Sequence, residues 1–209
     1  MKKIKIILGI LVATILLTPV LAYASPTGRL NQSITSGTLS TDIRDASYVT
    51  VGSPSFNMTA ATVSNACQTI TGTYGDNAQR VYVDNPGGAN NGFTLAIAST
   101  AGSGALWTSG GNTYDFDDAA GGGCTNGQLT LDPSVSTLGL DGSSTSTGIT
   151  KGTATAFLSN SSITLLNAAA GSDDIWRGYL TGIGVSQKIP ASKPAGTYVL
   201  DLTQTVTAL

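Results

Sequence analysis

After residue 24 the chain lacks the apolar spacing that a helix needs, and this feature constrains its fold more than any other. Apolar residues at i, i+3, i+4 and i+7 do not recur in any segment there. What recurs is short apolar and polar alternation, broken by Gly, Asn, Pro and Ser at intervals of roughly 8 to 15 residues. Strong helix formers are scarce, because Glu is absent and Thr, Ser, Gly and Val dominate. The pattern predicts an all-β fold, a single-domain antiparallel β-sandwich of roughly ten short strands.

The clearest predicted hairpin lies in the first half of the chain. Gln79–Asp84 and Phe93–Ala98 both alternate, and residues 85–92 between them are rich in Asn, Gly and Pro. Trp176–Ile189 predicts one long strand interrupted by three glycines, which are typical of bulges or close backbone approaches. Residues 198–207 predict the last and best-formed strand.

Shorter alternating segments predict the remaining strands, and one Ser-, Thr- and Gly-rich stretch, Ser134–Gly152, predicts a long loop. The expected short strands are Gly37–Ile43, Ser55–Thr59, Cys67–Tyr74, Ala105–Thr108, Gln128–Leu131, Ala154–Leu158 and Ser162–Leu166.

Residues 1–24 have the three parts of a cleaved signal peptide. Three lysines precede an apolar run, Ile6–Leu17, and Ala22-Tyr23-Ala24 supplies the small-x-small pattern that signal peptidase reads. The run is about a dozen residues, short of the roughly 20 that a membrane-spanning helix needs. We therefore expect residues 25–209 to be a secreted domain, extracellular or on the cell surface, with no membrane span after signal cleavage.

The two cysteines, Cys67 and Cys124, suit an exported protein. In an oxidising compartment an even pair indicates a disulfide, and closing this loop of 57 residues would stabilise the fold by about 4 kcal/mol. Two free thiols or a thiol metal pair is the other interpretation, although a second ligand type of the right kind is missing.

Charged residues exclude several classes of function. The chain contains no His and no Glu, which removes Ser-His-Asp triads, Cys-His pairs and imidazole zinc sites. After residue 24, seven basic residues face twelve Asp, a net charge of −5. Nucleic-acid binding needs a clustered basic surface, so we expect no nucleic-acid partner. This set of ionisable residues, which lacks the usual catalytic groups, predicts a protein that is not an enzyme.

The densest group of polar ligands lies between Asn112 and Asn126. Asp115, Asp117 and Asp118 fall within four residues, and Asn126 follows a run of glycines and Cys124. Carboxylate and amide oxygens are the ligands that Ca²⁺ takes, so these four residues are a candidate calcium site. The EF-hand pattern itself fails, since no Glu can fill its last position. The alternative is a solvated acidic turn that the disulfide tethers.

Three aromatic residues, Trp107, Tyr114 and Phe116, lie beside the acidic loop. Together with calcium they would form a lectin-like patch, while core packing is the competing interpretation for aromatic side chains in a sandwich of this size. Core packing is what we expect for Phe56, Phe93, Phe157, Trp176 and Tyr198.

Three segments carry resemblances to known surface proteins. The ending IPASKPAGTYVLDLTQTVTA resembles WxL-type cell-wall-binding domains and pilus-like or spore-coat-like subunits, although the Trp-x-Leu motif itself is missing. Residues 30–40, with SGTL, resemble the first strand of TasA/camelysin-like matrix-fibre proteins. ALWTSGGNTYDFDD is similar to uncharacterised secreted surface proteins of candidate-phylum bacteria. These resemblances imply a β-sandwich with a structural or adhesive role, and they transfer no functional residue.

Two functions remain as hypotheses. The first is an exported structural protein of the cell surface or extracellular matrix, which assembles with copies of itself when Leu30–Leu39 completes a neighbour's sheet. The alternative, which we favour somewhat over strand donation, is that this segment is simply the domain's own first strand. The second is a calcium-assisted module that binds glycan or a cell-wall polymer.

Overall fold

The computed structural model separates the chain into two units, residues 1–34 and residues 35–209. The residues that it describes are 29–87, 90–118, 124–159, 161–172 and 175–209. Of the first unit, residues 29–34 are described and carry no strand. Every described strand lies in the second unit, and all strand pairs there are antiparallel.

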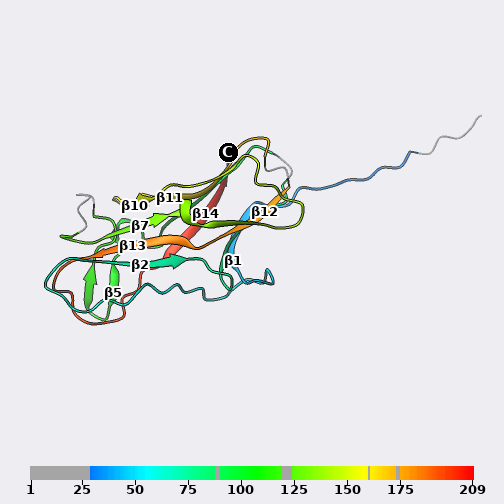
Figure 1. Cartoon of the computed structure of the whole chain (residues 1–209). Coiled ribbons are helices and arrows are strands. Elements are labelled where there is room, and N and C mark those ends of the chain that lie inside the picture. Colours follow the sequence, from blue (N-terminus) through cyan, green and yellow to red (C-terminus); the bar gives the residue numbers. More distant parts are fainter. Residues whose placement is uncertain (1–28, 88–89, 119–123, 160, 173–174) are drawn as a thin grey trace, which may run out of the picture. The chain divides into compact units, whose positions relative to one another are not determined.

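The second unit is all-β, as the alternation predicts, and its described part has no α-helix. In chain order its strands are β1 (Ser40–Arg44), β2 (Gln68–Tyr74), β3 (Arg80–Asn85), β4 (Phe93–Ser99), β5 (Trp107–Ser109), β6 (Asn112–Tyr114), β7 (Gln128–Asp132), β8 (Thr137–Leu140), β9 (Ile149–Lys151), β10 (Thr155–Ala156), β11 (Ile163–Ala168), β12 (Trp176–Thr181), β13 (Ile183–Ile189) and β14 (Leu202–Ala208) (Figure 1).

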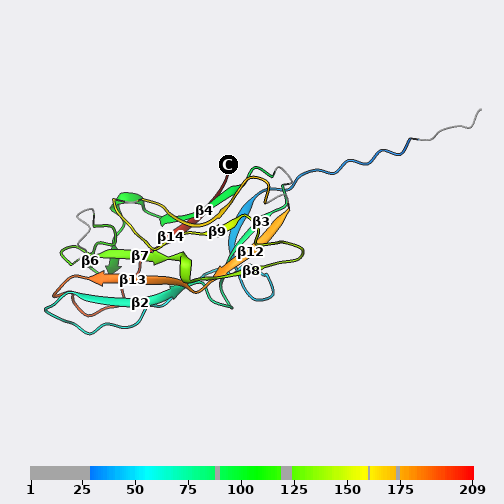
Figure 2. The same cartoon turned by 45° about the horizontal axis from the view of Figure 1, so that its top comes forward.

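Two four-stranded sheets continue into one another and form the first layer. Their strand orders are β1-β3-β12-β8 and β10-β7-β13-β2. The chain crosses from one sheet to the other three times, from β2 to β3, from β7 to β8 and from β12 to β13. The two strands of each pair therefore lie end to end, like one long bent strand (Figure 2). At the bend the Gly182 N–H donates to the Gly75 carbonyl at 2.7 Å. Both glycines have positive φ, 71° and 82°, a conformation that other residues rarely adopt.

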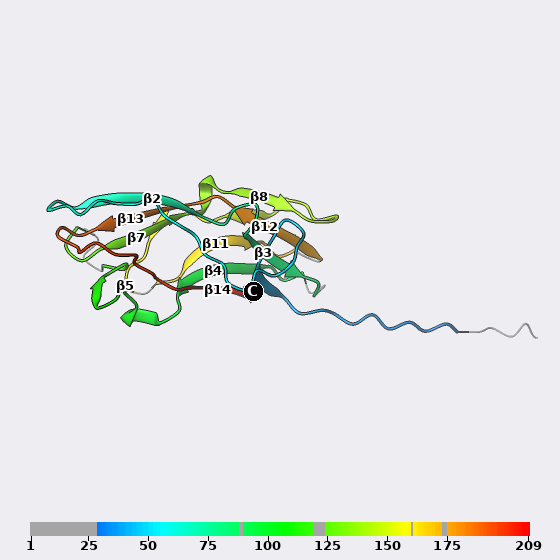
Figure 3. The same cartoon turned by 90° about the horizontal axis from the view of Figure 1, so that it is seen from below.

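The second layer is a four-stranded sheet in the order β14-β4-β11-β9, and Figure 3 shows it lying along the first layer. Strand β4 alternates strictly between buried and half-buried residues, and Phe93, at its start, meets Trp176 of β12 across the layers with ring centroids 5.5 Å apart. Apolar side chains from both layers form one core cluster. This arrangement is the predicted β-sandwich, with more strands than the sequence indicated.

The predicted hairpin is wrong, although both of its strands form. β3 pairs with β1 and β12 in the first layer, whereas β4 pairs with β14 and β11 in the second. Each strand has an apolar face, Val81 and Val83 on one and Phe93, Leu95 and Ile97 on the other, and all five side chains are buried. The connection of residues 86–92 is long enough for the two faces to pack across the core instead of pairing edge to edge.

The predicted loop Ser134–Gly152 is also wrong in part, because it contains β8 and β9. The long predicted strand Trp176–Ile189 is confirmed as β12 and β13, and its break falls at Gly182. The expectation that Leu30–Leu39 forms the domain's own first strand is wrong, since its residues carry no strand and β1 begins at Ser40.

The predicted disulfide is confirmed. Cys67, just before β2, and Cys124, just before β7, are bonded with their Cα atoms 5.4 Å apart. The bridge therefore joins the starts of two strands that flank β13 in the same sheet. In the described part of the chain, no helix is long and apolar enough to cross a membrane.

Candidate functional site

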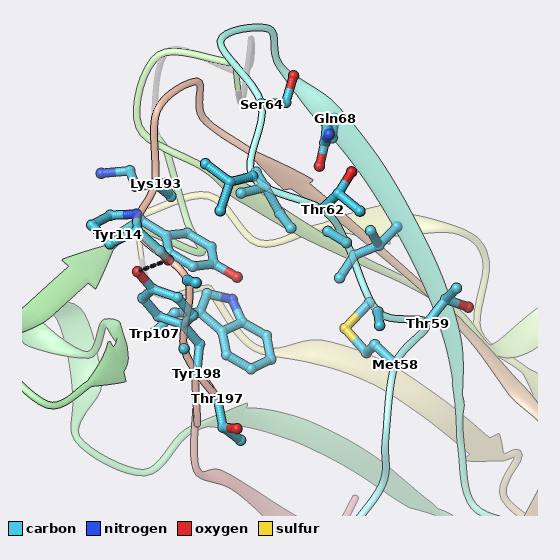
Figure 4. A pocket seen from close by; sticks show the side chains of 18 of the residues that line it. Met58, Thr59, Thr62, Ser64, Gln68, Trp107, Tyr114, Lys193, Thr197 and Tyr198 are labelled. Atoms are coloured by element: carbon cyan, nitrogen blue, oxygen red, sulfur yellow. Dashed lines mark hydrogen bonds between the residues drawn. The ribbon is translucent and has the colours of Figure 1, made fainter.

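A groove of about 540 Å³ lies at the end of the sandwich where the β5–β6 hairpin is found (Figure 4). Three segments line it: residues 56–66 with the adjoining edge of β2, the β5–β6 hairpin, and the loop of residues 189–198 that connects β13 to the last strand. Its volume is within the range of about 300–1,000 Å³ that is typical of ligand pockets.

One wall of the groove is aromatic. Trp107 of β5 stacks on Tyr114 of β6, with ring centroids 6.0 Å apart and an angle of 18° between the ring planes. The Tyr198 ring also packs against Tyr114, with ring centroids 5.0 Å apart and an angle of 59° between the ring planes. Tyr114 is buried, whereas Trp107 and Tyr198 are half-buried. The Trp107 and Tyr198 rings are therefore partly accessible from the groove, and the Tyr114 ring is largely covered.

Hydrogen bonds hold this aromatic wall in place. The Trp107 indole N–H donates to Oε1 of Gln187 at 2.8 Å, and the fully buried Gln187 donates from Nε2 to the Lys188 carbonyl. The Tyr198 hydroxyl donates to the Pro194 carbonyl at 3.0 Å. Thr108 and Val199 exchange two backbone hydrogen bonds, which tie the hairpin to the start of the last strand segment.

The opposite wall is formed by the extended segment 56–66 beside β2. The Thr59 N–H donates to the Thr71 carbonyl at 2.8 Å, and Met58 forms an isolated bridge with Gly72. A Cβ at Gly72 would lie 3.0 Å from Met58 Cα, so a glycine allows this close approach. Figure 4 shows Met58 on this side pointing toward the aromatic wall, with Thr62 and Gln68 further along the segment and β2, whereas the Thr59 hydroxyl points away from that wall.

The groove carries little charge. Among its described lining residues Lys193 is the one ionisable group besides the two tyrosines, and no carboxylate is present. The Lys193 ammonium donates to the Thr113 carbonyl at 3.2 Å. Burial raises the pKa of Tyr114 far above its usual value, so this hydroxyl keeps its proton at a basic pH where an exposed tyrosine would lose it.

Of the candidate calcium residues, Asp115, Asp117 and Asp118 follow β6 and Asn126 precedes β7, and the Asp115 N–H donates to the Asn126 carbonyl at 2.9 Å. One oxygen of Asp115 accepts the backbone N–H groups of Phe116 and Asp117, at 2.7 and 3.1 Å. Asp117 and Asp118 are buried and Asn126 is exposed. Among the residues that the structure describes, no three His, Cys, Asp or Glu side chains gather as a metal site. Residues 119–123 lie outside the described part, and calcium binding stays a prediction.

The structure brings together only two of the three aromatic residues of the predicted patch. Trp107 and Tyr114 meet at the groove, but Phe116 is fully buried in the core, 5.3 Å from the ring of Phe157. Tyr198, which we expected in the core, joins the groove instead, and Phe56 is half-buried at its edge. Segment 56–66 has no motif that indicates a wall of a binding site.

A second candidate site is the open edge of β14. In the described sheet β14 pairs with β4 alone, and its Gln204 side chain accepts a hydrogen bond from the Thr41 hydroxyl of β1 in the other layer at 3.3 Å. The Asp201 carbonyl accepts the Thr100 N–H and the Leu209 N–H donates to the Gly92 carbonyl, so odd-numbered residues direct their backbone polar groups toward β4. The N–H and C=O groups of Leu202, Gln204 and Val206 therefore point to the open edge.

Known proteins offer no identification. No protein-family model, no curated protein and no solved structure matches this chain.

Proposed function

We propose that this chain is a non-enzymatic, exported structural protein of the cell surface or extracellular matrix, which assembles when the N-terminal segment of one copy adds to the β14 edge of the next. One observation carries the proposal. Residues 29–39 carry no strand, and the Leu30 and Ile34 side chains are 98% and 87% exposed. Two exposed large aliphatic side chains, spaced so that a strand would place them on one face, are suited to a partner.

The N-terminal segment has the same side-chain pattern as β14. Residues 30–35 read Leu-Asn-Gln-Ser-Ile-Thr, and residues 202–207 read Leu-Thr-Gln-Thr-Val-Thr. In β14 the Leu, Gln and Val side chains are half-buried and the three threonines are exposed. A donor strand of this sequence would therefore continue both faces of the sheet, the half-buried one with Leu30, Gln32 and Ile34.

One antiparallel register satisfies both the backbone of β14 and the side-chain pattern. Gln32 opposite Gln204 places Leu30 beside Val206 and Ile34 beside Leu202, and these β14 residues have their N–H and C=O groups on the open edge. Main-chain hydrogen bonds would then give affinity, as they do for the antiparallel pairs within the domain.

The β14 edge lacks three common devices against pairing. Lys, Pro and β-bulges commonly block edge strands, and β14 contains neither residue and pairs with β4 without a register shift. Because donor and acceptor are different surfaces, each copy can offer one and use the other. Such head-to-tail contacts generate open chains unless the rotation closes a ring, which suits a matrix or surface layer.

The test adds charge to the donor face. Sedimentation velocity of residues 25–209 should show concentration-dependent assembly, which Leu30→Asp with Ile34→Asp abolishes because two carboxylates would be buried against β14. The matched control, Asn31→Asp with Ser33→Asp, has the same added charge on the outward face and should still assemble. A wild-type chain that stays monomeric at all concentrations, or equal behaviour of the two variants, would contradict the proposal.

A further inference from the structure

We infer that the groove between Trp107, Tyr198 and residues 56–66 is a binding site for an uncharged glycan chain, and that this site works without calcium. The inference is independent of strand addition, because the groove and the β14 edge share no residue.

The aromatic wall provides the apolar half of such a site. Pyranose rings with equatorial hydroxyls have faces of C–H groups, which pack on aromatic rings whose polar edges are bonded elsewhere. The Trp107 N–H is bonded to Gln187 and the Tyr198 hydroxyl to Pro194. Both rings are therefore fixed before a ligand arrives, which reduces the entropy lost on binding.

The facing wall combines apolar side chains, such as Met58 and Val63, with polar ones. Thr62 and Gln68 place a hydroxyl and an amide group among these lining residues. Sugar hydroxyls both donate and accept hydrogen bonds, and so do these side chains. An acyl chain would leave these polar groups unpaired at its surface, so a lipid fits the lining less well.

The charge of the groove indicates an uncharged ligand. No described lining residue is acidic, and Lys193 already donates to a backbone carbonyl. The chain after residue 24 has a net charge of −5, which would repel a polyanionic wall polymer. A neutral glycan chain would be repelled neither by a carboxylate in the groove nor by the net negative charge of the protein.

The experiment uses chitohexaose and cellohexaose as probes, with residues 25–209 and isothermal titration calorimetry in EDTA. Iodide quenching of tryptophan fluorescence reports occupancy in the unaltered protein, because Trp107 is half-buried whereas Trp176 is only 1% exposed. We expect at least one probe to bind and to shield Trp107 from iodide.

Two variants locate the binding. Trp107→Ala should weaken binding about tenfold or more, as the loss of a central aromatic contact does. Tyr48→Ala, which removes a partly exposed tyrosine outside the groove, should bind as the wild type does. Thermal unfolding of each variant verifies that it is folded.

Four results would overturn the inference: neither probe binds, binding leaves Trp107 accessible to iodide, Trp107→Ala binds like Tyr48→Ala, or binding requires calcium. Shielding of Trp107 by a synthetic peptide of residues 29–36, without shielding by either sugar, would also overturn it, because the groove would then accept a chain segment. None of these outcomes depends on whether copies assemble.

Discussion

Tyr82 shows how the outer face of β3 is held by aromatic and charged groups. Its hydroxyl donates to an oxygen of Asp141 at 2.7 Å, and the Arg44 guanidinium lies 4.3 Å from the ring centroid. Burial, followed by the hydrogen bond and negative charge of Asp141, raises the pKa of Tyr82 to about 12. The folded protein therefore retains this proton at a pH where an unfolded chain has lost it.

This shift predicts a loss of stability in base. The contribution of Tyr82 is complete below its ordinary pKa of 10.0 and is lost as pH rises through about 12. Burial also raises the pKa values of Tyr74 and Tyr114, so the wild-type free energy of unfolding, measured in urea, should fall steeply above pH 10. Asp141→Asn should lower the pKa of Tyr82 and flatten this fall, while leaving the other two tyrosines unchanged. Identical pH profiles for wild type and variant would show that Asp141 has no such effect.

At the scale of elements, Gly182 determines how β12 continues into β13. Its φ is 71°, and a Cβ built there would have no atom within 4 Å, so Gly182→Ala adds backbone strain without a clash. We expect a loss of about 1–2 kcal/mol in the free energy of unfolding. Gly104 also has open space for a Cβ but no positive φ, and Gly104→Ala should be neutral or slightly stabilising. Equal effects of the two substitutions in chemical denaturation would contradict this explanation.

Alternation in the sequence was enough to predict most strands but not their partners. It identified β3 and β4 because Val81, Val83, Phe93, Leu95 and Ile97 are apolar at every second position. It could not say that these faces pack across the core, since periodicity describes one strand and not its neighbour. β8 and β9 were missed because they are only four and three residues long and lie in a stretch rich in Ser, Thr and Gly.

The groove was only partly predictable for a similar reason. Trp107 and Tyr114 stand seven residues apart in the sequence, and their hairpin brings them together locally. Tyr198 and residues 56–66 reach the groove only through the sheet, by way of the Thr108–Val199 and Met58–Gly72 bridges. No local pattern in the sequence records such long-range bridges.

At the scale of the whole molecule, the proposed donor segment and the proposed acceptor strand are far apart in the sequence. Residues 30–36 precede β1, and β14 is the last strand. On this account the last strand of one copy receives the first residues of the next, and the resulting chain of domains displays one glycan groove per copy. Repetition would convert modest affinity at each groove into strong retention on a polymer.

Cross-linking between copies tests strand addition most directly. In the proposed register Ser33 and Thr203 form a pair without hydrogen bonds, with Cα atoms about 4.5 Å apart, a distance that a disulfide can span. The native cysteines are bonded to one another. Mixed under mild oxidation, a Ser33→Cys copy and a Thr203→Cys copy should form a disulfide-linked dimer. A Thr150→Cys copy, altered on β9 at the other edge of the same sheet, should not link to Ser33→Cys.

The cross-linking results distinguish two questions: which edge of the sheet accepts the segment, and whether copies assemble at all. Cross-linking to Thr150→Cys instead of Thr203→Cys would leave assembly intact and move the acceptor edge to β9. A chain carrying both Ser33→Cys and Thr203→Cys that closes its bridge within one monomer would place the segment on its own β14. Specific cross-linking of Ser33→Cys to Thr203→Cys between copies is the result that the account predicts, and its absence together with a monomeric wild type would contradict the account.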